Sequence, residues 1–202
     1  MKKLVVVSIV AAVLLASGAV FGKSATTEHE LEIRIPDVLF LRITDGTEGS
    51  NASADNPSVM FDFQALENID TYMDMVNAGG GDLEPTNVNN FGDVIVFANR
   101  GAWSVGVSAE DFDFEDNLDL EVTHNGVALG DIKVVRSGTP GTNVSSVAAS
   151  WDLTTATAIA SGTRTQGWNS LGFSGIDYSF TVDGHEAPGT YTTTVTYTIT
   201  AP

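Results

Sequence analysis

The sequence predicts an all-β fold, an antiparallel immunoglobulin-like β-sandwich with at most one short helix. Three observations predict it: short segments in which apolar and polar residues alternate, turn residues between those segments, and almost no helical periodicity. The chain has 202 residues, of which 43% are hydrophobic, so it can bury one core. It contains no cysteine, which excludes disulfides and thiolate metal sites.

The N-terminus has the pattern of an export signal. Lys2 and Lys3 precede an uncharged apolar run over residues 4–21, and small residues follow that run. A basic start, an apolar stretch and small residues before the cut are typical of a secretory signal peptide. We therefore predict a signal peptide over residues 1–22, with residue 25 as the latest cleavage point and an uncleaved membrane anchor as the alternative.

Residues 23–202 are predicted to form a single β-sandwich domain. Export would place this domain in the extracellular space or at the cell surface, with the periplasm as the alternative, and without stable membrane insertion after cleavage. Aspartate and glutamate number 26 against 9 lysines and arginines, which gives a net charge of −17. That charge argues against nucleic acid as a partner, because phosphate binding needs clustered cations.

The first β-structure is expected near the start of this domain. Apolar and polar residues alternate over residues 30–43, which indicates a strand with one buried face. Pro36 interrupts the pattern and cannot donate a hydrogen bond to a ladder. Two strand pieces are therefore expected, over residues 28–35 and 38–44.

The next part of the chain is expected to be irregular for the most part. Residues 45–57 and 78–90 are rich in turn-forming residues and are predicted to be loops. Between them we predict a short strand over residues 58–63. The apolar spacing over residues 65–76 fits a short helix or an irregular crossing.

Two turns predict β-hairpins. Arg100-Gly101 separates apolar runs over residues 93–99 and 102–109, and Asn125-Gly126 divides the segment 118–135. Further strands are predicted over the segments 144–151, 154–160 and 175–182.

The clearest strand covers residues 191–200. Its even positions are all threonine, and its odd positions are apolar or aromatic apart from Thr193. Threonine is β-branched and tolerates water. We expect a long antiparallel strand with one face toward the core and the other toward solvent or a partner.

Carboxylates are densest over residues 110–121. Four of them are weak calcium candidates, because calcium prefers roughly six to eight oxygen ligands: Asp111, Asp113, Glu115 and Asp116. Their spacing does not match an EF-hand, and a solvated acidic turn is the favoured interpretation. We therefore predict no cofactor, with calcium kept as the alternative.

No catalytic motif is present. His29, His124 and His185 stand outside any zinc-binding or nucleophile motif. Carboxylates are so frequent that a pair suited to glycosidase chemistry carries no signal. We predict that the chain is not an enzyme, and a secreted hydrolase with scattered triad residues remains only a third hypothesis.

One tryptophan is a candidate for carbohydrate binding. Trp103 alternates with Val105 and Val107, which favours a position in the core. Trp168 lies in a glycine-rich stretch and is the candidate for stacking on a glycan, although a structural role is favoured for it as well.

The C-terminal stretch over residues 187–200 resembles the closing strand of exported bacterial β-sandwich surface proteins of the spore coat protein U and fimbrial, pilin-like type. A Gly-Thr-Tyr turn leads there into an alternating threonine and valine strand. Gly189 is the fourteenth residue from the end, as in chaperone–usher pilins. This chain has Ala201 where those pilins usually carry an aromatic residue, and it lacks the disulfide that many of them contain.

The resemblance implies that subunits join by donor-strand exchange, in which an N-terminal extension fills a groove in the next subunit. Residues 26–35 have the pattern of such a tail, since Leu31, Ile33 and Ile35 could fill pockets while the residues between them stay in water. Each buried leucine or isoleucine contributes roughly 1.5–3 kcal/mol, and strand addition supplies backbone hydrogen bonds as well. The same pattern fits a strand that pairs within its own domain, and the sequence does not separate the two.

The first functional hypothesis is an exported structural cell-surface protein, a subunit or accessory of a pilus-like filament or coat. Its expected partners are copies of itself or related surface subunits. The alternative is a secreted carbohydrate- or calcium-binding β-sandwich module.

Overall fold

The chain divides into two compact units, Met1–Pro36 and Asp37–Pro202. The computed structural model describes residues 32–34, 36–47, 49–115, 126–154 and 157–202. In the first unit, residues 32–34 carry no helix or strand, and the Arg34 Nε donates a hydrogen bond to the Glu32 Oε1 over 2.7 Å. The predicted signal peptide lies outside the described residues.

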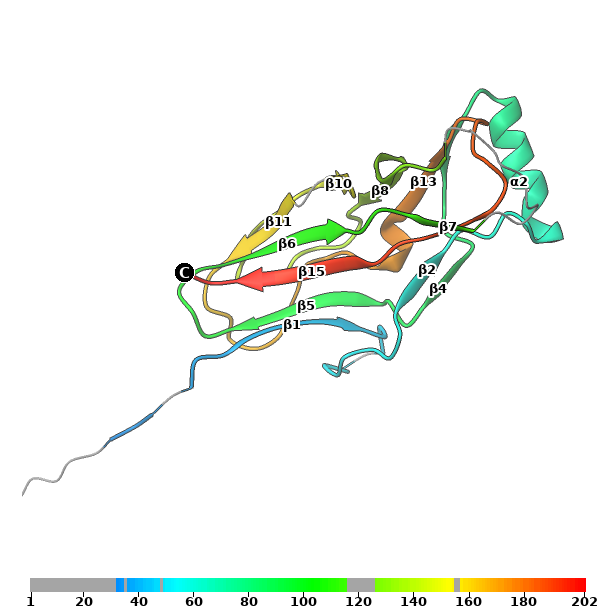
Figure 1. Ribbon diagram of the computed structural model, residues 1–202. Coiled ribbons are helices and arrows are strands. Elements are labelled where there is room, and N and C mark those ends of the chain that lie inside the picture. The colour runs from blue at the N-terminus through cyan, green and yellow to red at the C-terminus, as the bar shows by residue number, and fades with distance from the viewer. Residues whose placement is uncertain (1–31, 35, 48, 116–125, 155–156) are drawn as a thin grey trace, which may run out of the picture. The chain divides into compact units, whose positions relative to one another are not determined.

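Residues 37–202 form antiparallel β-structure with one α-helix in the described part (Figure 1). One sheet has the order β1-β5-β12, with β1 (Leu39–Thr44), β5 (Asp93–Ala98) and β12 (Asn169–Ser170). A second has the order β15-β6-β11-β9, with β15 (Val195–Thr200), β6 (Trp103–Ala109), β11 (Thr157–Gly162) and β9 (Val144–Val147). The all-β prediction with one short helix is confirmed.

A third sheet and two ribbons complete the body. The third sheet has the order β10-β8-β13-β3, with β10 (Ser150–Asp152), β8 (Ile132–Val135), β13 (Tyr178–Val182) and β3 (Gly81–Leu83). The ribbons pair β14 (Thr190–Thr192) with β7 (Asp113–Glu115), and β2 (Ser58–Met60) with β4 (Asn87–Asn89). Short 3-10 turns, η1 (Leu129–Asp131) and η2 (Gly175–Asp177), lead into β8 and β13.

One apolar core lies between these sheets. On β5 and β6 every second side chain is buried in the same cluster: Val94, Val96, Ala98, Trp103, Val105 and Val107. Strands β8 and β13 add further buried residues to it, and Trp151 packs edge-on against Phe173 with ring centroids 4.8 Å apart. The core position predicted for Trp103 is confirmed.

The hairpin predicted at Arg100-Gly101 is wrong. β5 pairs with β1 and β12, whereas β6 pairs with β15 and β11, so the chain passes from one sheet to another at this turn. Both edges of each strand are already bonded, and the buried faces of β5 and β6 line the same core. The two strands therefore stack across the core instead of pairing. The hairpin predicted at Asn125-Gly126 lies partly outside the described residues.

The last predicted strand is interrupted. β14 pairs with β7 and β15 pairs with β6, because the partner chain itself breaks between Ala109 and Asp113. The alternation survives the break: the even threonines are exposed and the odd residues are half-buried. The segment predicted as an acidic turn thus contains strand β7, where the Phe114 ring packs on Tyr191 with centroids 4.6 Å apart.

The loop predicted over residues 78–90 contains two strands, β3 and β4. Each has three residues, which is too short for a periodic pattern to show in the sequence. Both form through partners distant along the chain, β3 with β13 and β4 with β2.

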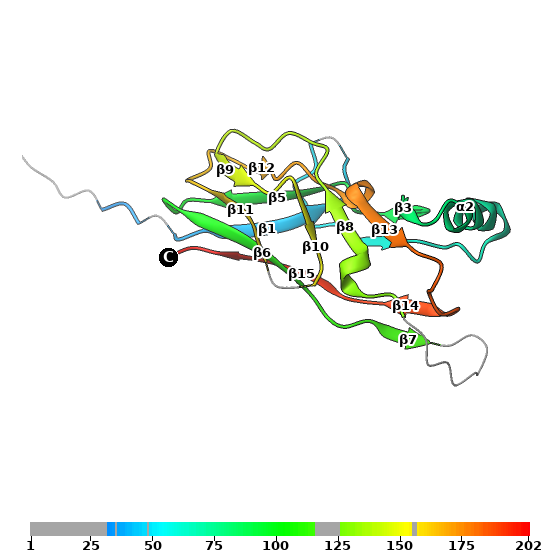
Figure 2. The same cartoon turned by 90° about the horizontal axis from the view of Figure 1, so that it is seen from above.

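The predicted helix is α2 (Leu66–Asn77). The Asp62 carboxylate accepts hydrogen bonds from the backbone amides of Gln64 and Ala65, at 3.0 and 3.2 Å, just before the helix begins. The Tyr72 hydroxyl donates to the Glu186 Oε2 over 2.8 Å and ties the helix to the loop after β13. No residue of α2 is buried, so the helix covers the end of the sandwich from outside (Figure 2).

Candidate functional site: the seam between β1 and β15

β1 and β15 are the edge strands of two different sheets, and residues of the two strands lie close together. β1 bonds to β5 on one side only, and β15 bonds to β6 on one side only. In the described part of the chain, no ladder joins β1 to β15. We call this line of contact the seam.

The register of β1 fixes which backbone groups face the seam. The Val38 carbonyl accepts a hydrogen bond from the Asn99 amide over 3.1 Å, so the even residues of β1 turn their N–H and C=O groups toward β5. The odd residues Leu39, Leu41 and Ile43 turn theirs outward. The Ile43 carbonyl accepts from the Ala54 amide over 2.7 Å, which closes that end of the row.

The same argument applies to β15. The Thr194 carbonyl accepts a hydrogen bond from the Glu110 amide over 3.1 Å, so the even residues bond to β6. Val195, Tyr197 and Ile199 therefore direct their backbone N–H and C=O groups into the seam. Two rows of backbone donors and acceptors, three residues long on each strand, thus border one line.

The floor of the seam is apolar. The odd side chains of both strands are half-buried and pack against the main core: Leu39, Leu41, Ile43, Val195, Tyr197 and Ile199. Backbone groups left without partners away from water cost free energy comparable to a lost hydrogen bond. A strand added here could bond to both rows and bury every second side chain on this floor.

Arg100 ties together both ends of the body where β1 begins and β15 ends. Its Nε donates to the Asp37 Oδ1 over 2.7 Å, its Nη2 bonds to the second oxygen of the same carboxylate, and its Nη1 donates to the Pro202 carbonyl over 3.3 Å. The next residue inward is also held, because the Asn99 Oδ1 accepts from the Val38 amide over 2.9 Å. The sequence carried a signal for this clamp, since Arg100 is the one basic residue among residues 45–121.

The candidate strand-exchange residues lie in the first unit. Ile33 is 72% exposed, and the residues on either side of it belong to no strand. Leu31 and Ile35 lie outside the described residues. The strand piece expected over residues 28–35 is absent at the described residues 32–34, and donor-strand exchange through this tail stays a prediction.

The calcium candidates lie along one exposed stretch. Asp113 and Glu115 are exposed on β7, and Asp111 is exposed just before that strand. Asp116 lies outside the described residues. Among the residues that the structure describes, no three histidine, aspartate or glutamate side chains come together to hold a metal ion.

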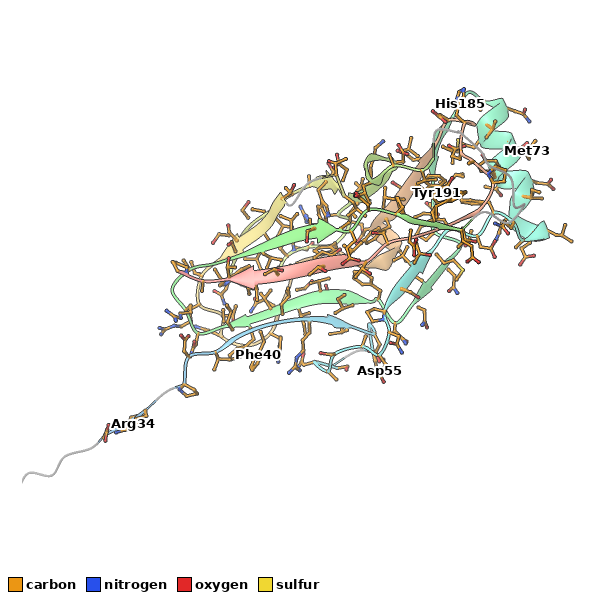
Figure 3. All side chains as sticks on the ribbon, viewed as in Figure 1. Arg34, Phe40, Asp55, Met73, His185 and Tyr191 are labelled. Atoms are coloured by element: carbon orange, nitrogen blue, oxygen red, sulfur yellow. The ribbon has the colours of Figure 1, made fainter. Side chains whose placement is uncertain are left out.

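Trp168 and His185 lie in separate places. Trp168 is half-buried beside β12, with the Arg42 guanidinium carbon 4.5 Å from its ring centroid. His185 is exposed next to α2 and lies 3.2 Å from the Asp183 carboxylate (Figure 3). His29 and His124 lie outside the described residues.

Comparison with known proteins found no matching family model, no matching curated protein and no matching solved structure. Within the described ranges, no helix has the length and apolar character needed to cross a membrane.

Proposed function

We propose that the chain is an exported structural subunit of a pilus-like filament or coat, whose copies join by β-strand addition. The tail over residues 26–35 of one copy would enter the seam of the next. The observation that supports this most is the pair of facing edges on β1 and β15, each with outward backbone groups and neither bonded to the other.

The tail and the seam match in period and length. Each row of the seam presents three outward-facing residues, and the tail carries three apolar residues at every second position. A strand placed between the rows would bury one face on the apolar floor and leave the charged residues of the tail in water.

Charge favours this kind of joint over a broad surface contact. A chain with a net charge of −17 repels its own copies. Backbone hydrogen bonds and apolar burial are screened little by salt, so they can hold copies together where surface ion pairs contribute only about 0–1 kcal/mol. The alternation of threonine on β15 also leaves the outer face of this strand free of charge.

Hydrogen exchange tests the acceptor directly. In a variant that lacks residues 26–35, the amides of Leu41, Tyr197 and Ile199 should exchange quickly, while the even residues beside them stay protected by β5 and β6. Adding a peptide of residues 26–36 should slow the exchange of the outward amides only. Uniform protection along β15 without the peptide would contradict the seam as an open acceptor.

Sedimentation of the whole mature chain tests the assembly. We expect concentration-dependent oligomers from the intact chain and a folded monomer from the variant without residues 26–35. Ile33→Asn should weaken assembly, whereas the neighbouring Arg34→Asn is the matched control with little effect. The proposal is wrong if the shortened chain unfolds, because the tail is then a strand of its own domain. It is equally wrong if the intact chain stays monomeric at its highest attainable concentration.

A further inference from the structure

A polar cleft of about 510 Å³ opens at the β12 side of the three-stranded sheet. None of its lining residues belongs to β1 or β15, so the cleft is distinct from the seam. Five glycines and six serines or threonines line it, together with two aspartates and Trp168. No lysine, arginine or histidine of the described chain lines the cleft.

Glycines shape the walls for structural reasons. A Cβ on Gly92 would lie 2.1 Å from the Gly46 Cα, and a Cβ on Gly138 would lie 2.7 Å from the Gly172 carbonyl oxygen. Two pairs of loops therefore approach each other closely on either side of the cleft. The Gly92 amide donates to the Thr44 carbonyl over 2.7 Å and the Gly138 amide donates to the Gly172 carbonyl over 2.9 Å, which fixes the loops beside the cleft.

Asp93 is the carboxylate with capacity left for a ligand. Its Oδ1 accepts a hydrogen bond from the Ser170 Oγ over 2.8 Å, and the Val94 amide also donates to the carboxylate. The Ser170 Oγ itself accepts from the Gly172 amide over 2.8 Å, so its single proton is directed to Asp93. A carboxylate accepts about four hydrogen bonds, and burial raises the pKa of Asp93 because the charged form loses water.

Asp177 has a different role. Its Oδ1 accepts from the Ser137 amide over 3.1 Å, and its Oδ2 accepts from the Ser174 amide over 2.7 Å. Asp177 is 8% exposed and closes the turn η2. It holds the loops around the cleft, and Asp93 faces the space between them.

Trp168 packs against three neighbours at the rim. The Phe40 ring stacks on it with centroids 6.1 Å apart, the Phe97 ring lies 5.7 Å away, and the Arg42 guanidinium lies against the indole. Phe40 is 48% exposed on the outer side of β1 (Figure 3). The cleft therefore has one aromatic wall next to a polar floor.

The chemistry of this lining selects a class of ligand. Anions are disfavoured because the lining carries two carboxylates, and the guanidinium of Arg42 at the Trp168 ring already donates to the Asn51 carbonyl. Hydroxyl, amide and carboxylate groups next to one aromatic side chain suit a ligand that has many hydroxyls and apolar C–H edges. We propose that the cleft of Asp93 and Trp168 binds a neutral oligosaccharide, with a sugar hydroxyl donating to the Asp93 carboxylate.

Ligand-observed NMR on the whole mature chain tests the proposal. The probes are the neutral hexasaccharides of glucose (cello and malto), xylose, mannose and N-acetylglucosamine. We expect at least one to bind with a dissociation constant of about 1 mM or tighter, a level usual for a few hydrogen bonds and one aromatic contact. Trp168 fluorescence should shift on binding, because Trp103 and Trp151 are only 2% and 7% exposed.

Variants distinguish the cleft from nonspecific binding. Asp93→Asn keeps the shape and should weaken binding about tenfold or more, because a hydrogen bond to a charged acceptor is lost. Thr139→Trp, on the exposed rim, should block the cleft without altering the core. Asp74→Asn on α2 removes the same charge far from the lining and should leave the affinity unchanged.

Two results would overturn the proposal: no hexasaccharide binds, or Asp93→Asn and Thr139→Trp bind as tightly as the parent chain. Both are independent of filament assembly, because a chain without residues 26–35 keeps every residue of the cleft.

Discussion

Removing a single hydroxyl from the core next to the seam should destabilise the protein. The hydroxyl oxygens of Tyr178 and Tyr197 lie 2.5 Å apart, and Tyr178 is only 5% exposed. Phe91 packs edge-on against both rings, at 6.0 and 6.4 Å between centroids. The two hydroxyls lie among aromatic rings and bond to each other, so they depend on each other for hydrogen bonding.

The magnitude follows from which groups lose a partner. Tyr197→Phe leaves the Tyr178 hydroxyl buried without its partner, which costs about 1–3 kcal/mol. Tyr178→Phe likewise leaves the Tyr197 hydroxyl without its hydrogen-bond partner, and we expect a cost of similar size. The double variant removes both polar groups, so we expect it to cost less than the sum of the single variants by about 1 kcal/mol or more.

Urea unfolding of the parent chain, the two single variants and the double variant at pH 7 measures these costs. The dependence on urea should keep the same slope, because the exposed area on unfolding hardly changes. The reasoning is refuted if each single variant costs less than about 0.5 kcal/mol, or if the two single costs add up to that of the double variant.

Three further outcomes follow from the core and the glycine contacts. Burial raises the pKa of Tyr178 to about 12, so the unfolded chain releases this proton first, and this group alone should lower stability by about 1–1.5 kcal/mol between pH 9 and pH 11. Urea unfolding at the two pH values measures the loss, and Tyr178→Phe should reduce it without removing it, because the pKa values of Tyr72 and Tyr197 are raised as well. Gly92→Ala should destabilise by about 1–3 kcal/mol, because the added Cβ meets the Gly46 backbone, whereas Gly101→Ala has open space and should change little in the same melts. Phe173→Ala, at a side chain 2% exposed, should cost about 3–5 kcal/mol in urea unfolding.

The sequence predicted those elements whose cause is local. The alternation of threonine with apolar residues is a property of β15 itself, and it appears in the structure as an exposed and a half-buried face. The apolar spacing of α2 likewise follows from its own residues. The pattern of β15 therefore reports which of its faces turns toward the core.

Pairing could not be predicted in the same way. Arg100-Gly101 gives a tight reversal in either a hairpin or a passage between sheets, and the choice depends on whether β1 and β15 occupy the edges of β5 and β6. Those partners are far away along the chain. β3 and β4 were missed for the same reason, because three-residue strands exist only through their partners.

The candidate sites were hidden from the sequence for a different reason. The seam consists of backbone groups, which every residue carries, so no side chain marks it. The sequence pointed to only one residue of the cleft, Trp168, through its glycine-rich surroundings. Asp93 lies at the start of a buried strand, and its hydrogen-bond partner Ser170 comes 77 residues later in the chain. The clamp at Arg100 joins Asp37 to Pro202 and depends on the meeting of the two ends.

Unpaired edge strands normally invite uncontrolled association, and proteins block them with lysine, proline or a covering segment. Neither β1 nor β15 contains lysine or proline, and the two edges lie close together without a ladder between them. No ladder joins the two strands in the described part of the chain, so separating them breaks no ladder hydrogen bond. A third strand that bonds to both edges would therefore gain hydrogen bonds on two sides, which is what the proposed assembly by strand addition requires.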